Sequence, residues 1–390
     1  MKVNPLKSKL KSLYTIFIAP PKEWQLPKKA EVLIYDECGS EYFVPYLTKY
    51  HVTTMAMRGE NINLPCLLRA MLKLEFWKRN PLKAYAKAYI HAVSPKVVIT
   101  FIDNNTSFYE ISKSFPNIKT ILVQNGDRDN WLDTSTVKYK YHIDYMLVFG
   151  SCIGTYYGTH ITGEVLPIGS LKNNAVSNLN GVAGDGVLFI SQWYEPEGGK
   201  AYHFEHDGTP VYSHQFFTAE VIALKFLDRW CVENNKQLKI CGRQKNKDGH
   251  EKEFYADCLK ECVWEYVPHM DNYNSYKLTD AAEIVVTIDS TLGYESICRG
   301  NKTAAFTCRG SSILSPKAWW PFGGPSDRPN NGPFWTNYQD EIQFQRVMDY
   351  LNTVSDEDWK QTRQEEYGSE LMESDPGNTR FVALLDQLLT

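Results

Sequence analysis

The chain has 390 residues, with 46 Asp and Glu against 42 Lys and Arg, which gives a formal net charge of −4. This nearly balanced charge excludes a nucleic-acid-binding protein that depends on bulk positive charge. Nine cysteines are scattered without a C-x-x-C pair, which indicates buried, reduced thiols in a cytoplasmic protein. No apolar run reaches the roughly 18 residues of a membrane span.

Residues 1–29 begin with a basic stretch, contain a short apolar patch, and end at Lys28 and Lys29 without a small-residue cleavage site. A signal peptide is therefore not expected. We interpret the segment as a solvated arm before the first strand. The alternative is a weak basic contact with an anionic membrane, which would place the protein at the inner face of the inner membrane.

Short apolar segments in the first half of the chain predict buried strands. Turn residues bound them, and helical patterns separate them, of which Pro65 to Ile90 is the longest. This alternation predicts a parallel sheet covered by helices on both faces. The predicted strands are Val32–Tyr35, His51–Met55, Val97–Phe101, Thr120–Val123 and Tyr145–Phe149.

The same alternation restarts after Ser177 to Gly186, a stretch rich in Gly, Asn and Asp that predicts a linker. We therefore expect two doubly wound α/β domains, residues 1–176 and 187–370, and a C-terminal helix within 371–390. Ligands of such sheets bind beyond the carboxyl ends of the strands, here in the cleft between the domains. In the second half, strands are predicted at Val187–Ile190, Leu238–Cys241, Ile284–Ile288 and Thr303–Phe306, and helices at Phe216–Val232 and Glu251–Cys262.

Polar segments that follow the strands are candidates for this cleft. Ser191 to Gln215 runs about twenty-five residues without periodicity and is rich in aromatic residues, which favours a functional loop. Ser315 to Trp335, rich in Pro, Gly and Trp, predicts a lid or, alternatively, a packed surface loop. Further cleft candidates are Gln124, Asn125, Arg128 and Gln192.

The most informative unit is "IVVTIDSTLGYESICRGNKTAAF", a strand, a polar turn, a short helix and a second strand. Ser290 and Thr291 are placed to cap the helix and to donate hydroxyls to a phosphate at its N-terminus. Gly293 would let a ligand approach the backbone. Glu295, expected on the first turn, would accept from a ribose diol. The alternative is a capped helix without a ligand.

This unit resembles the nucleotide-binding element of the GT-B glycosyltransferases, in which two Rossmann-like domains face each other across a cleft. "EVLPIGSLKNN" resembles the last strand of a GT-B first domain entering the interdomain connection. The segment "TRFVALLDQLL" resembles the C-terminal helix that crosses back to that domain. The resemblance implies a GT-B fold, with a nucleotide sugar as donor and a saccharide as acceptor.

Four segments, "VVITFIDNNTSFYEI", "VQNGDR", "VLFISQW" and "DSTLGYESICRGNKT", resemble bacterial surface-polysaccharide biosynthesis proteins that include the retaining β-Kdo transferases. The resemblance implies CMP-Kdo as donor and a saccharide or lipid-linked saccharide as acceptor in O-antigen or capsule synthesis. It also implies a carboxylate nucleophile, retention of configuration and no metal or other cofactor. The alternatives are a UDP-sugar-dependent transferase or epimerase on the same fold, and a non-catalytic saccharide-binding module.

Acidic residues after predicted strands are the catalytic candidates, because double displacement needs a carboxylate at the anomeric carbon. Asp207, in the long loop and next to His206, is the first choice, and Glu195 is another acid of that loop. Asp103, after the strand Val97–Phe101, is the second choice. Simple turns at Asp207-Gly208 and at Asp103 are the alternatives.

Basic residues after Cys241 are candidates for the nucleotide or its phosphate, namely Arg243 and Lys245, with a solvated face as the alternative. Pro268 and His269 precede the informative unit, where GT-B enzymes contact the base. Asp127 and Asp129 form a D-x-D sequence that binds metal in other glycosyltransferases. Because the context is GT-B-like, we expect no metal here.

Overall fold

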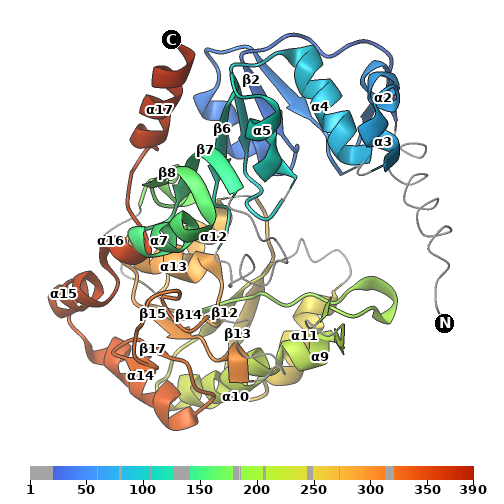
Figure 1. Cartoon of the computed structure of the whole chain (residues 1–390). Coiled ribbons are helices and arrows are strands. Elements are labelled where there is room, and N and C mark those ends of the chain that lie inside the picture. Colours follow the sequence, from blue (N-terminus) through green and yellow to red (C-terminus); the bar gives the residue numbers. More distant parts are fainter. Residues whose placement is uncertain are drawn as a thin grey trace.

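The computed structural model describes residues 21–58, 60–78, 81–105, 107–126, 141–178, 184, 186–204, 208–243, 249–271, 273–311 and 320–390. Within them, two larger sheets form the centres of two α/β domains, which lie one above the other in Figure 1. Both sheets consist mainly of buried, β-branched and aliphatic strands, and helices cover their faces. This arrangement is what near-continuous apolar strand segments require.

The first sheet has six parallel strands in the order β3-β2-β5-β6-β7-β8. Every strand segment predicted in the first half of the chain belongs to it. Val32 pairs with both Val52 and Val97, so β2 lies between β3 and β5. The bounds are β2 Val32–Tyr35, β3 Val52–Met55, β5 Val97–Thr100, β6 Lys119–Val123, β7 Tyr141–Val148 and β8 Ile161–Pro167.

The helical pattern predicted between Pro65 and Ile90 is helical in the structure, but the chain divides it into three helices. These are α2 (Leu64–Met71), α3 (Leu74–Lys78) and α4 (Pro81–Val93). The N–H of Lys73 donates to the carbonyl of Ala70, three residues back, and this tighter turn ends α2. Pro81 then starts α4, at the position where its missing N–H costs least.

The second sheet has the order β13-β12-β9-β14-β15-β17-β16, in which all pairs are parallel except β16 with β17. Strand β9 is the third of these seven strands; the chain runs from it to β12 and β13 on one side, and then from β14 to β15 on the other. The topological switch point therefore lies between β9 and β14. The bounds are β9 Val187–Ile190, β12 Leu238–Cys241, β13 Trp264–Val267, β14 Ile284–Thr287, β15 Thr303–Phe306, β16 Asn331–Gly332 and β17 Trp335–Thr336.

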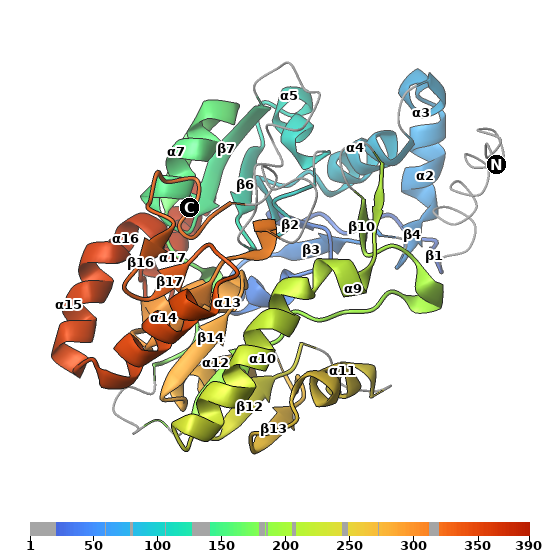
Figure 2. The ribbon, with the colours of Figure 1, turned by 90° about the horizontal axis from the view of Figure 1, so that it is seen from below.

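Helices of the second domain flank this sheet on both sides (Figure 2). The segment predicted as one helix from Phe216 is divided at Phe217 into α9 and α10. The bounds are α9 Ser213–Phe216, α10 Thr218–Glu233, α11 His250–Cys258, α12 Asn274–Asp280, α13 Thr291–Arg299, α14 Glu341–Thr353, α15 Asp356–Glu366 and α16 Gly368–Leu371. The first domain and the connection add β1 Lys22–Glu23, β4 Ile62–Asn63, α5 Ile111–Ser114, α7 Ser151–His160 and α8 Leu171–Asn174.

Two segments predicted as loops contain regular structure. In the first, His203–Phe204 (β10) pairs with Pro210–Val211 (β11) as a short antiparallel hairpin. In the second, Trp335 lies in β17 and is almost fully buried, with its ring stacked on that of Phe322. The described part of the second segment packs against the second domain and also against α7 of the first domain, where Trp320 lies edge-on to Tyr156.

The C-terminal helix α17 (Thr379–Leu389) packs on the first domain, although its sequence follows the second. Phe381 and Leu385 belong to one apolar cluster with Val32 and Ile99 of the first sheet. Figure 1 shows the chain crossing back through α16 to α17. No helix of the described residues is long and apolar enough to cross a membrane.

Candidate functional site

A cavity of about 620 Å³ lies between the two domains. Tyr42, Asn125 and Gly126 line it from the first domain, and Lys172 lines it from the connection. The second domain supplies most of the remaining wall, including the residues that follow β9, β12 and β14. The cavity is therefore located where the predicted fold places a ligand, beyond the carboxyl ends of the strands.

The topological switch point of the second sheet forms one wall of this cavity. Ser191 and Gln192 follow β9 directly, and Asp289 and Ser290 follow β14. Because β9 and β14 are parallel neighbours from which the chain winds in opposite directions, the segments after them separate and leave a crevice.

The N-terminus of α13 points its first turn at the cavity, which Ser290, Thr291 and Leu292 line. Ser290 occupies the N-cap position as predicted, but its hydroxyl makes no capping hydrogen bond to a described residue. Its N–H donates to Thr287 Oγ1 at 3.2 Å. The positive end of the helix dipole and the first-turn N–H groups favour an anion at this point.

The structure assigns Gly293 a different role from the predicted one. Gly293 is buried and is not among the residues that line the cavity. A methyl group at its Cα would overlap the side chain of Thr287 in β14. The glycine therefore allows α13 to pack closely on β14, and its contribution to the site is indirect.

Glu295 lines the cavity from the second turn of α13, not from the first. It is 2% exposed, and each carboxylate oxygen accepts from a protein hydroxyl: Oε1 from Ser170, and Oε2 from Tyr276 at 2.9 Å. Glu295 thus ties the interdomain connection to α12 and α13. A carboxylate has about four acceptor sites, so further bonds to a ligand hydroxyl remain open.

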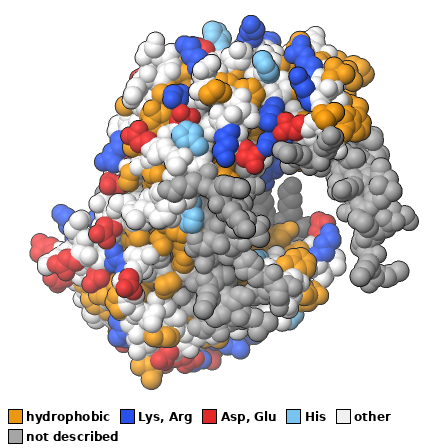
Figure 3. Space-filling model, viewed as in Figure 1, with side chains coloured by type: hydrophobic (Ala, Val, Ile, Leu, Met, Phe, Trp, Pro, Cys, Tyr) orange, Lys and Arg blue, Asp and Glu red, His pale blue; other side chains and the backbone are white. Residues whose placement is uncertain are grey.

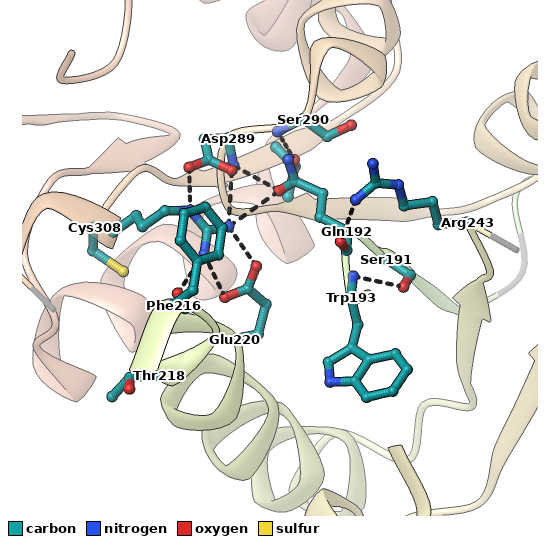
Figure 4. A network of polar contacts seen from close by, with 12 residues as sticks. Ser191, Gln192, Trp193, Phe216, Thr218, Glu220, Arg243, Asp289, Ser290 and Cys308 are labelled. Atoms are coloured by element: carbon teal, nitrogen blue, oxygen red, sulfur yellow. Dashed lines mark hydrogen bonds and ion pairs between the residues drawn. The ribbon is translucent and has the colours of Figure 1, made fainter. Parts of the chain in front are cut away.

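Arg309, which follows β15, is the centre of a buried polar network at one side of the cavity. Its Nε donates to Asp289 Oδ2 at 2.6 Å, and its Nη2 donates to Asp289 Oδ1 at 3.0 Å. Its Nη1 donates to Glu220 Oε2 at 3.0 Å and to the carbonyl of Phe216 at 2.7 Å. In Figure 4, Asp289, Glu220 and Gln192 converge on this one guanidinium. Three elements distant in sequence, α10, the turn after β14 and the segment after β15, are therefore fixed together.

The charges of this network favour a cationic Arg309. Its side chain is 2% exposed and lies 4.3 Å from the centre of the Phe216 ring. Burial opposes the charge, but the carboxylates of Asp289 and Glu220 outweigh it and raise the pKa of Arg309. The guanidinium charge is already compensated by Asp289 and Glu220, so the network does not itself attract a phosphate.

A second network holds the segments after β9 and β12. Glu251, 1% exposed, accepts from the Ser191 hydroxyl, from the N–H of Arg243 at 2.8 Å and from the Tyr266 hydroxyl at 2.8 Å. The Arg243 Nη1 in turn donates to the carbonyl of Gln192 at 2.9 Å. These bonds fix the two segments against each other.

Basic side chains approach the cavity from different directions. Arg243 enters from β12, His269 from the loop after β13, and Lys172 from the connection. The Lys172 Nζ lies 5.9 Å from the centre of the Tyr42 ring. Together with the N-terminus of α13, these groups line a cavity that can accept an anion.

Several predicted site residues lie elsewhere. Asp103 is fully buried in the first domain, where its carbonyl accepts from the Tyr109 hydroxyl at 2.6 Å. Gln124 is also buried. Its side-chain Nε2 donates to the carbonyl of Gly126, and its Oε1 accepts from the N–H of Phe149, both at 3.0 Å. These bonds fix the loop that carries Asn125. Neither Asp103 nor Gln124 is among the residues that line the cavity.

Two further predictions also fall outside the cavity wall. Glu195 is exposed, and Pro268 is half-buried beside His269 without lining the cavity. The predicted Asp207, His206, Lys245 and Arg128 lie outside the described residues, as does the D-x-D sequence Asp127–Asp129. The predictions brought together at the cavity are Asn125, Gln192, Arg243, His269, Ser290, Thr291 and Glu295.

The sequence interpretation missed Arg309, Glu220, Asp289, Lys172 and Tyr42. A signal existed for Arg309, because "TCRGSS" places it shortly after a buried strand, which is the position from which most of the cleft candidates were chosen. Glu220 carried no such signal, since it lies inside a helix and meets Arg309 only through the fold.

Comparison with known proteins identifies a family and a fold. A family profile of putative O-antigen biosynthesis proteins matches residues 121–389. No curated protein sequence matches the chain. Among solved structures, a variant of the wall teichoic acid polymerase TagF is similar at 9% identity and a TM-score of 0.52, over 92% of this chain and 89% of that chain.

Two epimerase structures are also similar. A UDP-N-acetylglucosamine 2-epimerase has 13% identity and a TM-score of 0.52, over 92% of this chain and 96% of its own. The UDP-GlcNAc 2-epimerase from Neisseria meningitidis bound to UDP-GlcNAc has 8% identity and a TM-score of 0.50, over 92% and 98%. At these identities the likeness concerns the fold alone. The predicted GT-B fold is confirmed, whereas the resemblance to Kdo transferases stays a prediction.

Proposed function

This chain belongs to the family of putative O-antigen biosynthesis proteins, and from that premise we propose that it is a glycosyltransferase with a nucleotide-sugar donor. The acceptor is a saccharide or a lipid-linked saccharide of a surface polysaccharide. The observation that carries the proposal is the cavity at the switch point, which lies between two Rossmann-like domains and is lined by the N-terminus of α13 and by Arg243, His269 and Lys172.

The donor phosphate is proposed to bind at the N-terminus of α13. There the Ser290 hydroxyl and the first-turn N–H groups would donate to phosphate oxygens, and Arg243 would supply a full positive charge. In the transfer step, negative charge develops on the leaving phosphate, so donors held in place before the reaction lower the barrier. His269 and Glu295 flank this position and are proposed to contact the nucleoside.

Retention needs a carboxylate free to attack the anomeric carbon. Of the carboxylates among the described cavity-lining residues, Asp289 is held by two bonds from Arg309, and Glu295 accepts from two hydroxyls. Asp289 already balances the charge of Arg309, and Glu295 is held in place by two hydroxyls, so both are suited to positioning rather than to attack. Asp207 therefore stays the proposed nucleophile, with His206 beside it.

For the sugar, the proposal is Kdo from CMP-Kdo with retention of configuration and without a metal. It is supported by the four segments that resemble β-Kdo transferases and by the family's link to O-antigen synthesis. The epimerases of similar fold make a UDP-sugar epimerase the alternative to be tested in the same assay.

The proposal is tested by incubating the protein with CMP-Kdo and with UDP- and GDP-sugars, each with and without a saccharide acceptor. Products are identified by mass spectrometry. Release of CMP from CMP-Kdo is expected, together with an acceptor heavier by one Kdo residue. Epimerisation of a UDP-sugar without transfer would replace the proposal by the alternative. A protein that binds none of the nucleotides and modifies no donor would overturn it.

A further inference from the structure

The first domain exposes four large apolar side chains within ten residues of sequence. Leu68 on α2, Leu72 at its C-cap, and Leu74 and Trp77 on α3 are 61%, 85%, 68% and 68% exposed. We name them the α2–α3 patch. Exposed apolar residues scattered singly need no explanation, but a gathered group indicates a partner surface.

The side chains of the patch lie close together. Leu68 and Leu72 are four residues apart on consecutive turns at the end of α2 and therefore share a face. The Trp77 Nε1 donates to the carbonyl of Met71 at 2.8 Å, which folds the indole back onto the end of α2, beside Leu72. The buried side of α2, with Cys66, is already occupied by the core.

Positive charge surrounds the patch. Arg69 and Lys73 are exposed between its members, whereas the one carboxylate of this segment, Glu75, is bonded to Lys87 at 2.9 and 3.0 Å. Strand β1 at Lys22–Glu23 pairs with β4 just before α2. Of the described residues 21–29, three are lysines and one is a glutamate, although the whole chain has a net charge of −4.

Figure 3 shows the same combination on the surface, with hydrophobic side chains next to Lys and Arg over α2 and α3. Figures 1 and 2 place these helices at the end of the first domain away from α7. Among the described residues, the patch is therefore exposed at one end of the molecule.

We infer that the α2–α3 patch docks on the surface of an anionic lipid bilayer. Apolar side chains enter the boundary of the acyl chains, Trp77 lies at the headgroup level, and the basic residues meet anionic headgroups. Such docking brings the interdomain cavity close to an acceptor carried on a lipid. It goes beyond the proposed transfer and does not depend on the identity of the donor.

The test measures flotation of the full chain with phosphatidylcholine vesicles, with and without phosphatidylglycerol. Binding to the anionic vesicles is expected, and Leu72→Ser/Leu74→Ser should lower the partition coefficient at least tenfold. Arg69→Gln/Lys73→Gln should lower it roughly fivefold for each charge removed. The control Val263→Ser/Ile342→Ser removes two side chains that are 72% and 75% exposed in the second domain, and should change nothing.

A second readout locates the contact on the molecule. The indole emission of the wild type should shift to shorter wavelength on anionic vesicles, and Trp77→Phe should remove most of that shift. Absence of vesicle binding, or equal binding by the wild type and the Leu72→Ser/Leu74→Ser variant, would overturn the inference. If light scattering shows a dimer of the wild type and a monomer of the Leu72→Ser/Leu74→Ser variant, the patch binds a second copy of the chain instead. Nucleotide binding should be unchanged in all patch variants, which separates failure here from failure of the proposed function.

Discussion

Substitution of Arg309 by methionine tests the buried network that shapes one side of the cavity. The change keeps a long side chain but removes the guanidinium from Glu220, which is fully buried, and from Asp289. Breaking a buried ion pair by deleting one partner costs about 3–5 kcal/mol, because the other charge stays buried without compensation. We expect Arg309→Met to lose that amount of unfolding free energy at pH 8, a large share of the total.

The matched control for Arg309→Met is Arg229→Met. Arg229 forms an ion pair with Glu341 at 2.7 Å, but the two side chains are 46% and 57% exposed. Water screens this pair, so its loss should cost only about 0–1 kcal/mol. Arg309→Met/Glu220→Leu removes both buried charges and should recover much of the stability lost in the single variant.

The effect of Arg309→Met should depend on pH in a fixed direction. Burial already raises the pKa of Glu220, and loss of the guanidinium removes what opposes that rise. A carboxyl whose folded-state pKa exceeds its unfolded-state value stabilises the fold at low pH and loses this contribution as pH rises through the folded-state pKa. The deficit against wild type should therefore be smaller at pH 5 than at pH 8.

Urea unfolding followed by tryptophan fluorescence measures these differences at both pH values. Unfolding free energies of Arg309→Met and Arg229→Met that agree within about 1 kcal/mol at pH 8 would contradict this prediction. An equal loss of unfolding free energy in Arg309→Met at pH 5 and at pH 8 would contradict it as well, because the free-energy cost of a buried unpaired Glu220 depends on pH.

Three further predictions concern the proposed reaction. Glu295→Ala should lower the unfolding free energy by about 2–4 kcal/mol, since two buried hydroxyls lose their acceptor. It should also weaken nucleotide binding measured by calorimetry, and unchanged affinity would remove Glu295 from the binding site. Asp207→Ala should lose transfer by several orders of magnitude but still bind nucleotide, and peptide mapping of the wild type after donor incubation should show a sugar adduct on the peptide with Asp207. An adduct on the peptide with Asp103 instead would move the nucleophile to the first domain. Activity should survive EDTA; loss that Mg²⁺ or Mn²⁺ restores would make the D-x-D sequence a metal ligand.

The sequence predicted those parts of the molecule that depend on local pattern. Apolar runs such as Val187–Ile190 and Thr303–Phe306 are strands with the predicted bounds, because a buried parallel strand needs such a run. The turn after β14 was also predicted, since a strand, a polar turn and a helix are adjacent in sequence.

Contacts between distant segments were not predictable in this way. Glu295 was selected, but its bond to Ser170 joins residues 125 positions apart and exists only once the domains have met. Arg309 and Glu220 are 89 positions apart, and nothing in the helical pattern of α10 marks an inward-facing acid as an ion-pair partner. Gly293 shows the converse, because a glycine required for packing has the same sequence signal as one that admits a ligand.

The most direct test of the central claim is nucleotide binding by Ser290→Asp, measured by calorimetry with CMP and UDP beside the wild type. Asp is as good an N-cap as Ser, so the melting temperature should be unchanged or higher. Its carboxylate would lie where the account places the donor phosphate and would repel it. We expect the wild type to bind nucleotide with a Kd in roughly the micromolar to millimolar range, and Ser290→Asp to bind at least tenfold more weakly. Equal affinity of the two proteins, or no nucleotide binding by the wild type, would contradict it.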